Sequence, residues 1–172
     1  MAGNRWLAVL VVSLLLAAGV VLFRDDETTP TGSSSPRGDD APVVLQGRVA
    51  DIVDGDTIDL YDGTRIRLAI VDTPEIHGGV EPCGAEASDF AGAFLAGQTV
   101  AIYRPDGAPR RDRHGRLLGE VVRVADGSSL NIALVRVGLG RIDDRFAYED
   151  PDLVARLQIA AFGAPTPDCL PS

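Results

Sequence analysis

Five short segments of the chain alternate apolar and polar residues, the pattern of strands that are buried on one face. These segments span residues 43–53, 57–61, 65–71, 99–104 and 117–124. In the third segment Ile66, Leu68 and Ile70 share one face, and Arg67 points to the other. Five short strands in one chain predict a small barrel or sandwich.

Three further segments have helical spacing of their apolar residues. The first, 86–95, precedes Gly97, and the third spans 151–161. The second is expected to start at Asn131, a good N-cap, and to end at Gly138. A helix inserted between the third and fourth strands fits an OB-type barrel. We therefore predict an α+β, mainly β fold, a five-stranded OB-type barrel with about three helices; a generic α+β domain is the alternative.

A continuous apolar run lies near the amino terminus, from Trp6 to Phe23. As a helix it would rise about 27 Å, roughly the thickness of a bilayer core. Arg5 precedes the run and acidic residues follow it, so the positive-inside rule places the rest of the chain outside the cytoplasm. We expect residues 1–23 to be a signal peptide, which gives a secreted protein, or an uncleaved membrane anchor.

Residues 24–41 are rich in Thr, Ser, Pro, Gly and Asp, which predicts a flexible linker. Residues 42–172 are then the single folded domain. The chain of 172 residues has a net charge of −9, which argues against broad, non-specific coating of nucleic acid. One local phosphate site is compatible with this charge.

A hairpin brings the first charged residues together. The sequence YDGT at 61–64 predicts a two-residue turn between the second and third strands. In that register Ile58 faces Arg67 and Asp56 faces Ala69, so Arg67 is expected to lie near Asp56.

Further carboxylates are expected at the same end of the hairpin. Pro74 turns the chain and leaves Asp72 and Glu75 beside Asp56. Neighbouring carboxylates repel unless a hard cation lies between them. We therefore predict a Ca²⁺ site in which Asp56 and Asp72 are direct ligands, Thr73 adds its backbone carbonyl and Glu75 accepts a proton from water.

An arginine beside such a cation is typical of a phosphate clamp, since guanidinium groups hold phosphoryl oxygens two at a time. Arg67 is the first candidate and Arg116 in the arginine-rich segment 110–116 is the second. Each motif alone is more typical of an ordinary turn or solvated loop. Their joint occurrence favours a phosphodiester site.

The segments that carry these residues resemble the thermonuclease, or staphylococcal nuclease-like, family. The matching strings follow the family's order: VDGDTI at 53–58, IRLAIVDTPE at 66–75, CGAEA at 83–87, DRHGR at 112–116 and NIALVRVGL at 131–139. The resemblance implies an OB-type barrel and Ca²⁺-dependent hydrolysis of DNA and RNA to products with 3′-phosphate ends.

By position, the resemblance also assigns roles to the candidate residues. Asp56, Asp72 and Thr73 match the family's metal ligands. Arg67 and Arg116 match its charge-stabilising arginines, and Glu75 matches its general base or water-orienting residue. Those six residues are the predicted site: catalytic Arg67, Glu75 and Arg116, and metal-binding Asp56, Asp72 and Thr73.

The chain departs from the family on the substrate side. Where the family often has aromatic side chains that stack on the nucleotide, this chain has His114, Asp143, Asp144 and Arg145. Base stacking is worth roughly 1 to 3 kcal/mol per base, so these departures are expected to weaken binding more than chemistry. The rival hypothesis is a non-catalytic module that binds nucleic acid or protein; a third is a Ca²⁺ ion held only for stability.

Two cysteines, Cys83 and Cys169, complete the inventory. They fit an oxidising compartment and predict either one disulfide, two free thiols or intermolecular pairing. A monomer is the default expectation for the oligomeric state.

Overall fold

The computed structural model describes residues 43–143, 145 and 150–169. The predicted signal or anchor segment 1–23 and the linker 24–41 lie outside the described residues. Within the described part of the chain, no helix is long and apolar enough to cross a membrane.

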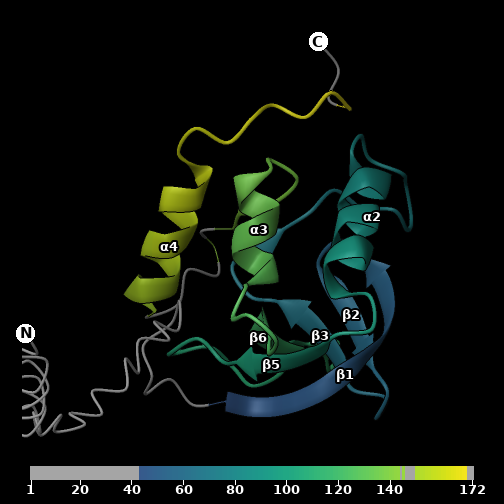
Figure 1. Cartoon of the computed structure of the whole chain (residues 1–172), viewed down its shortest axis with the longest axis vertical. Coiled ribbons are helices and arrows are strands. Elements are labelled where there is room, and N and C mark those ends of the chain that lie inside the picture. Colours follow the sequence, from purple (N-terminus) through teal and green to yellow (C-terminus); the bar gives the residue numbers. More distant parts are fainter. Residues whose placement is uncertain (1–42, 144, 146–149, 170–172) are drawn as a thin grey trace, which may run out of the picture. The chain divides into compact units, whose positions relative to one another are not determined.

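The five predicted strands are present and close into a barrel (Figure 1). The barrel order is β1-β2-β3-β6-β5. The strands are β1 (Val43–Asp54), β2 (Thr57–Leu60), β3 (Arg65–Leu68), β5 (Thr99–Tyr103) and β6 (Leu117–Arg123). All neighbouring pairs are antiparallel except β3 and β6, whose parallel pairing closes the barrel. Closure leaves no strand edge exposed along the barrel wall.

The hairpin register differs by one residue from the prediction. Thr57 pairs with Arg67 and Ile58 pairs with Ile66, so the predicted pairing of Ile58 with Arg67 is wrong. The loop has three residues rather than two, because Leu60 N–H donates to Thr64 O and the chain turns at Gly63, with φ of 82°. A three-residue loop with glycine in the left-handed region is a common hairpin connection.

Three helices stand on one side of the barrel (Figure 1). They are α2 (Gly84–Leu95), α3 (Leu130–Arg136) and α4 (Pro151–Ala161). Ser129, not Asn131, caps α3, because its side chain accepts the hydrogen bond of Ile132 N–H. Asn131 is instead fully buried and joins the helix to the barrel: its side chain accepts from Val121 N–H and donates to Ala69 O.

A second, two-stranded sheet lies beside the barrel. It pairs β4 (Val71–Asp72) with β7 (Arg141–Ile142). The predicted third strand therefore breaks after Leu68. The break falls at Ile70, a buried residue with φ of 63°, a conformation rare for a β-branched side chain. After this turn β4 pairs with β7 instead of continuing the barrel strand.

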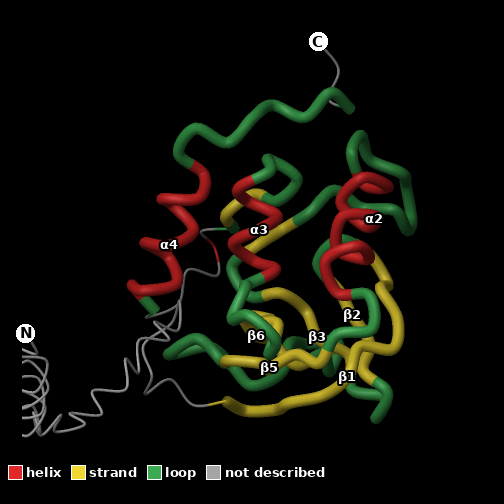
Figure 2. The backbone as a smooth tube through the Cα atoms, in the orientation of Figure 1, coloured by secondary structure: helices red, strands yellow, loops and turns green. Residues whose placement is uncertain are grey.

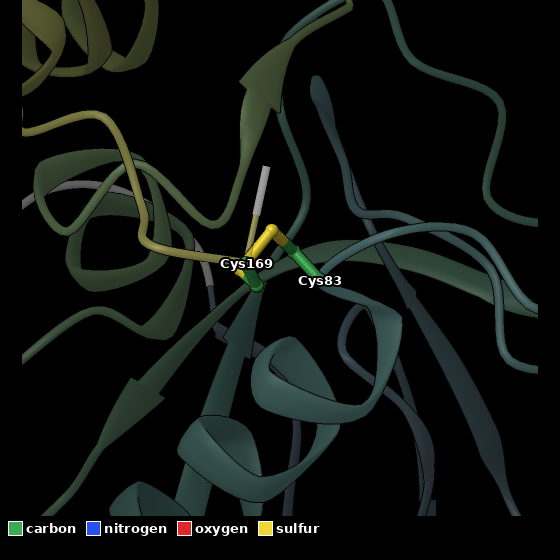
Figure 3. The surroundings of a disulfide bond; sticks show 2 residues. All are labelled: Cys83 and Cys169. Atoms are coloured by element: carbon green, nitrogen blue, oxygen red, sulfur yellow. A yellow bond between two sulfur atoms is a disulfide. The ribbon is translucent and has the colours of Figure 1, made fainter. Parts of the chain in front are cut away.

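The C-terminal segment after α4 crosses the end of α3 and reaches the start of α2 (Figure 2). There Cys169 forms a disulfide with Cys83, with the two Cα atoms 5.2 Å apart (Figure 3). Of the alternatives that the sequence left open, the structure therefore contains the intramolecular disulfide. The two cysteines are 86 positions apart in the sequence, so the disulfide closes a long loop.

A buried ion pair fastens α4 to the barrel. Glu120 on β6 is fully buried, and Arg156 on α4 donates to both of its carboxylate oxygens, at 2.8 and 2.9 Å. Arg156 also binds the exposed Asp152 one turn earlier. Burial lowers the pKa of Arg156, but the two carboxylates outweigh burial and raise it. The pair is charge-balanced only while both partners are present.

Removing Arg156 should therefore destabilise the fold. We expect Arg156→Met to lower the free energy of unfolding by about 3 to 5 kcal/mol, because the fully buried carboxylate of Glu120 would lose the guanidinium group that donates to both of its oxygens. Asp152→Asn, the matched control, should cost less than about 1 kcal/mol, since that pair is exposed. Urea unfolding of the full chain in mild detergent measures both; equal losses would contradict the anchoring role.

Candidate active site

The site is organised around the guanidinium group of Arg67 on β3. Its Nε lies 3.0 Å from Asp56 Oδ1, and its Nη2 donates to Asp72 Oδ1 at 2.8 Å. Asp56 comes from the turn between β1 and β2, and Asp72 comes from β4. One planar group thus holds two carboxylates from different elements, as the sequence predicted for Arg67 and Asp56 despite the shifted register.

The backbone around Ile70 completes the environment of the guanidinium. Arg67 Nη1 donates to the carbonyl oxygens of Leu68 and Val71. These two carbonyls converge because the chain reverses at Ile70 between them. The rare backbone conformation of Ile70 therefore fixes the orientation of Arg67.

Asp56 is buried, with an exposed fraction of 3%. Its Oδ2 accepts from both the backbone N–H and the hydroxyl of Thr73, at 2.9 and 3.1 Å, and its Oδ1 accepts from the Thr57 hydroxyl. Burial raises the pKa of Asp56 to about 7, and the Arg67 charge opposes this shift while the Asp54 charge adds to it. The charge of Arg67 therefore offsets only part of the cost of burying the Asp56 carboxylate.

Gly55 is required between the two buried aspartates. A Cβ atom at Gly55 would lie 2.8 Å from the Thr73 hydroxyl oxygen and 2.8 Å from Ala87 Cβ on α2. No side chain fits there, so the turn can bring Asp56 against Thr73 only with glycine.

Arg116 joins the same cluster from the start of β6. Its Nη1 lies 3.4 Å from Thr57 Oγ1, the hydroxyl that donates to Asp56. Asp112 holds Arg116 from the other side: Nε donates to Asp112 Oδ2 at 2.7 Å and the backbone N–H donates to Oδ1 at 2.9 Å. Arg116 and Arg67 therefore approach Asp56 from neighbouring strands.

Glu75 is exposed, in the segment that follows β4. Its backbone N–H donates to Glu81 Oε2 at 3.3 Å, and its carbonyl accepts from Glu81 N–H at 2.9 Å. Within the described residues its carboxylate has no hydrogen bond or ion pair with the other five candidates. The structure thus joins Asp56, Arg67, Asp72, Thr73 and Arg116 in one network and places Glu75 three residues beyond Asp72 along the chain.

A cavity of about 530 Å³ opens beside Arg67. Five arginine side chains contribute to its wall, although the chain as a whole is acidic. The lining residues with charged or ionisable side chains are Arg67, Asp72, Arg111, Asp112, Arg113, His114, Arg116, Asp143 and Arg145. A concave surface of this composition attracts anions.

The substrate-side positions form two paired groups in this wall. Arg113 Nε donates to His114 Nε2 at 3.0 Å. Arg145 binds both carboxylate oxygens of Asp143, at 2.8 and 2.9 Å, and this pairing lowers the pKa of Asp143. Polar and charged groups therefore occupy this part of the wall, as the sequence indicated; Asp144 lies outside the described residues.

The donor atoms of the site suit a hard cation. The described residues contain no cluster of three or more His, Cys, Asp or Glu side chains able to hold a metal ion. The predicted ligand set is smaller, two carboxylates and a backbone carbonyl, and its two carboxylates lie against the same guanidinium edge. All three are oxygen donors, the type that Ca²⁺ and Mg²⁺ prefer.

A closed five-stranded barrel with a cavity lined by arginine and aspartate side chains defines a small barrel protein with a charged site beside its wall. Comparison with known families agrees: residues 65–161, more than half of the chain, match the family described as staphylococcal nuclease homologue. The chain therefore belongs to the staphylococcal nuclease homologue family. Asp56 precedes the matched region, and the contacts to Arg67 and Thr73 connect it to that region.

Individual relatives cover the same part of the chain. An uncharacterized endonuclease of Escherichia coli O157:H7 is 34% identical over 105 residues, 59% of this chain and 63% of the relative. Endonuclease YhcR of Bacillus subtilis is 34% identical over 106 residues, 54% of this chain but 8% of that protein. The chain thus spans about three fifths of the length of the Escherichia coli relative.

Sequence reasoning missed three residues that support the site. Asp54 accepts the backbone N–H of Asp56, Thr57 links Asp56 to Arg116, and Asp112 holds Arg116. The motifs quoted from the sequence contain all three. For Asp54 and Asp112 the signal was spacing, since a side chain two to four residues away readily binds local backbone or side-chain groups. The contact of Thr57 with Arg116 spans 59 positions of sequence, and no local spacing signals it.

The hydrogen bonds between Asp112 and Arg116 should affect how the free energy of unfolding changes at acid pH. Burial raises the pKa of Asp112, but the hydrogen bonds from Arg116 and His114 outweigh it and hold the pKa below its ordinary value of 3.8. A lowered native pKa stabilises the fold above pH 3.8, and this stabilisation is lost as the pH falls through the native value. Asp112→Asn should therefore be less stable at pH 7 and should lose less stability on acidification.

Urea unfolding at a series of pH values from 7 to about 2 measures this slope. Glu86→Gln, an exposed change on α2, is the control and should keep the wild-type slope. Identical acid slopes for wild type and Asp112→Asn would show that Asp112 does not hold Arg116 in solution.

Proposed function

We propose that this protein is an extracytoplasmic, Ca²⁺-dependent nuclease that hydrolyses phosphodiester bonds of DNA and RNA and leaves 3′-phosphate ends. The observation that carries the proposal is the binding of Asp56 and Asp72 to one guanidinium, that of Arg67, at the cavity that Arg116 also lines. Family membership and the endonuclease names of the relatives support it.

The two arginines would hold the phosphodiester. Arg67 Nε and Nη2 face Asp56 and Asp72, and Arg116 approaches the same carboxylate through Thr57. A phosphoryl group under in-line attack gains charge on its equatorial oxygens, and preorganised guanidinium groups stabilise that charge. Because Leu68 O, Val71 O and Asp112 fix the two side chains, little reorganisation is needed during the reaction.

Asp56, Asp72 and the backbone carbonyl of Thr73 would hold the Ca²⁺ ion. When bound, the ion would neutralise the carboxylates and polarise a phosphoryl oxygen. With the carboxylates on the cation, Nε and Nη2 of Arg67 would be available to the phosphate. The same atoms of Arg67 that stabilise the carboxylates in the structure would thus bind substrate.

Glu75 would act on the attacking water. Its carboxylate is exposed, so it can accept a proton and return it to solvent. Attack by the water oxygen on phosphorus with departure of the 5′-oxygen leaves the phosphate on the 3′ side, as the proposed product requires. The departing 5′-oxygen would take a proton from solvent, which balances the proton that Glu75 returns to solvent.

The proposed location rests on the sequence of the amino terminus and on the disulfide. The apolar run 6–23 would anchor the chain in the membrane or direct its export, with the folded domain outside the cytoplasm. The disulfide between Cys83 and Cys169 fits that oxidising environment. The proposed protein is a monomer.

The first test is turnover of single-stranded DNA and RNA by the full chain, with Ca²⁺ and with a chelator. We expect Ca²⁺-dependent cleavage, and a loss of at least about a hundredfold in kcat for Arg67→Ala and for Glu75→Gln, because each removes a group that acts in the transition state. Arg65→Ala is the matched control, an exposed arginine two residues away that pairs with Asp59, and should retain activity. A folded wild type that binds Ca²⁺ but cuts neither substrate would refute the catalytic proposal.

The cation site has a separate test, which does not depend on turnover. Calorimetric titration of the full chain with Ca²⁺ should show one site, and Asp72→Asn should weaken binding by at least about tenfold because a charged oxygen ligand is lost. Asp59→Asn, which removes a carboxylate that binds Arg65 outside the site, should bind Ca²⁺ as the wild type does. Equal affinities for Asp72→Asn and wild type would exclude Asp72 as a ligand.

A further inference from the structure

The segment that carries Glu75 is closed on itself. Glu75 and Glu81 exchange hydrogen bonds, from each backbone N–H to an oxygen of the other residue. Between them, His77 Nε2 lies 3.0 Å from the carbonyl oxygen of Val53 at the end of β1. These contacts fix the backbone of Glu75, whereas its exposed carboxylate has no bond to another described residue. The position of the carboxylate therefore depends on the backbone of this segment.

The first residue of α2 lies directly against Glu75. A Cβ atom at Gly84 would lie 2.6 Å from Glu75 O and 3.0 Å from Ile76 Cγ2. The backbone of Glu75 and the start of α2 are thus in close contact, and a shift of one moves the other. Cys83, the residue before Gly84, is the point where this contact can be held.

The local hydrogen bond at Cys83 is made by its backbone: its carbonyl oxygen accepts from Ala87 N–H at 2.9 Å in the first turn of α2. Cys83 is the N-cap of α2 with φ of 71°, and its side chain makes no capping hydrogen bond. A left-handed conformation is unfavourable for a non-glycine residue and needs support from its surroundings. The covalent bond to Cys169 supports this conformation from the side-chain end of Cys83.

The other end of the disulfide is also fixed. The segment that leads to Cys169 packs on α3, since a Cβ atom at Gly138 would overlap Pro165 O and lie 3.2 Å from Pro167 Cδ. The disulfide thus ties the start of α2 to a packed segment rather than to a loose tail (Figures 2 and 3).

We propose that Cys83 and Cys169 are positioning residues for Glu75: their disulfide holds the start of α2 against the Glu75 backbone and so sets the place of the catalytic carboxylate. The inference rests on the proposed nuclease function. Its consequence is that loss of the disulfide lowers kcat through Glu75 and leaves substrate binding by the arginines in place.

A double-mutant cycle tests this coupling. In the full chain with Ca²⁺ and single-stranded DNA, Cys83→Ser/Cys169→Ser should lower kcat by about tenfold or more, with KM changed less than about twofold, because small displacements of a catalytic group are costly. In the Glu75→Gln background the same pair of changes should have no further effect on kcat, since the group to be positioned is already gone. An equal fold-loss in both backgrounds would overturn the proposal.

Two controls separate positioning from general stability. Ile102→Ala removes a fully buried barrel side chain and should destabilise the fold about as much as loss of the disulfide does, yet should keep kcat at temperatures where it is folded. Glu81→Ala should lower kcat, and Glu81→Gln should restore it because the amide oxygen can still accept from Glu75 N–H. A fall in kcat for Ile102→Ala equal to that of the cysteine variant would overturn the positioning role.

Hydrogen exchange gives a readout that does not need catalysis. The amide hydrogens of Glu75 and Glu81 should exchange at least about tenfold faster in Cys83→Ser/Cys169→Ser than in wild type, with the barrel strands unchanged. Faster exchange in a protein without nuclease activity would refute the proposed function but support the restraint of the segment. Unchanged exchange in an active protein would overturn the positioning inference alone.

Discussion

The interactions of Arg67 are the constraint on which the site depends. Its guanidinium group binds two carboxylates on one side and two backbone carbonyls on another. Satisfying all of them requires the barrel wall to end at Leu68, the chain to reverse at Ile70 and β4 to leave the barrel. The backbone conformation of Ile70 costs of order 1 to 3 kcal/mol, and the bonds to Arg67 help to offset this cost. Fold and site are thus joined through one side chain.

For the proposed nuclease function, the distribution of charge explains how an acidic protein would act on an anionic polymer. The net charge of −9 acts at long range and is screened within about 8 Å at physiological salt. Close to the cavity, the five arginines of its wall contribute most of the local charge. Two of them, Arg116 and Arg145, are each held by a neighbouring aspartate, Asp112 and Asp143. Such a surface favours a phosphate that is already in the cavity over nucleic acid elsewhere on the protein. Selectivity of this kind suits local cleavage better than tight, extended binding.

The sequence predicted the strands, the barrel and α4 closely, because period-two patterns and turn residues are local signals. It failed where the outcome depends on distant atoms. The YDGT turn allows loops of two or three residues, and the barrel pairing selects the longer one, which shifts Arg67 from Ile58 to Thr57. Asn131 is a suitable N-cap by residue type, but its side chain instead binds the buried backbone N–H of Val121 and C=O of Ala69. Ser129 caps the helix.

The residues of the candidate site could be predicted from the sequence, but the contacts that hold each of them in place could not. Asp56, Arg67, Asp72, Thr73 and Arg116 meet because three strands and a turn converge, which hydrophobic patterning already implies. Glu75 is different, since no side-chain contact fixes it within the described residues and its place depends on Glu81, Gly84 and a disulfide to the far end of the chain. A residue that must take up and release protons cannot also be tied by strong ion pairs without losing that function. Restraint through the backbone avoids this conflict, and so the proposed catalytic carboxylate of Glu75 is the member of the site whose position a sequence motif specifies least.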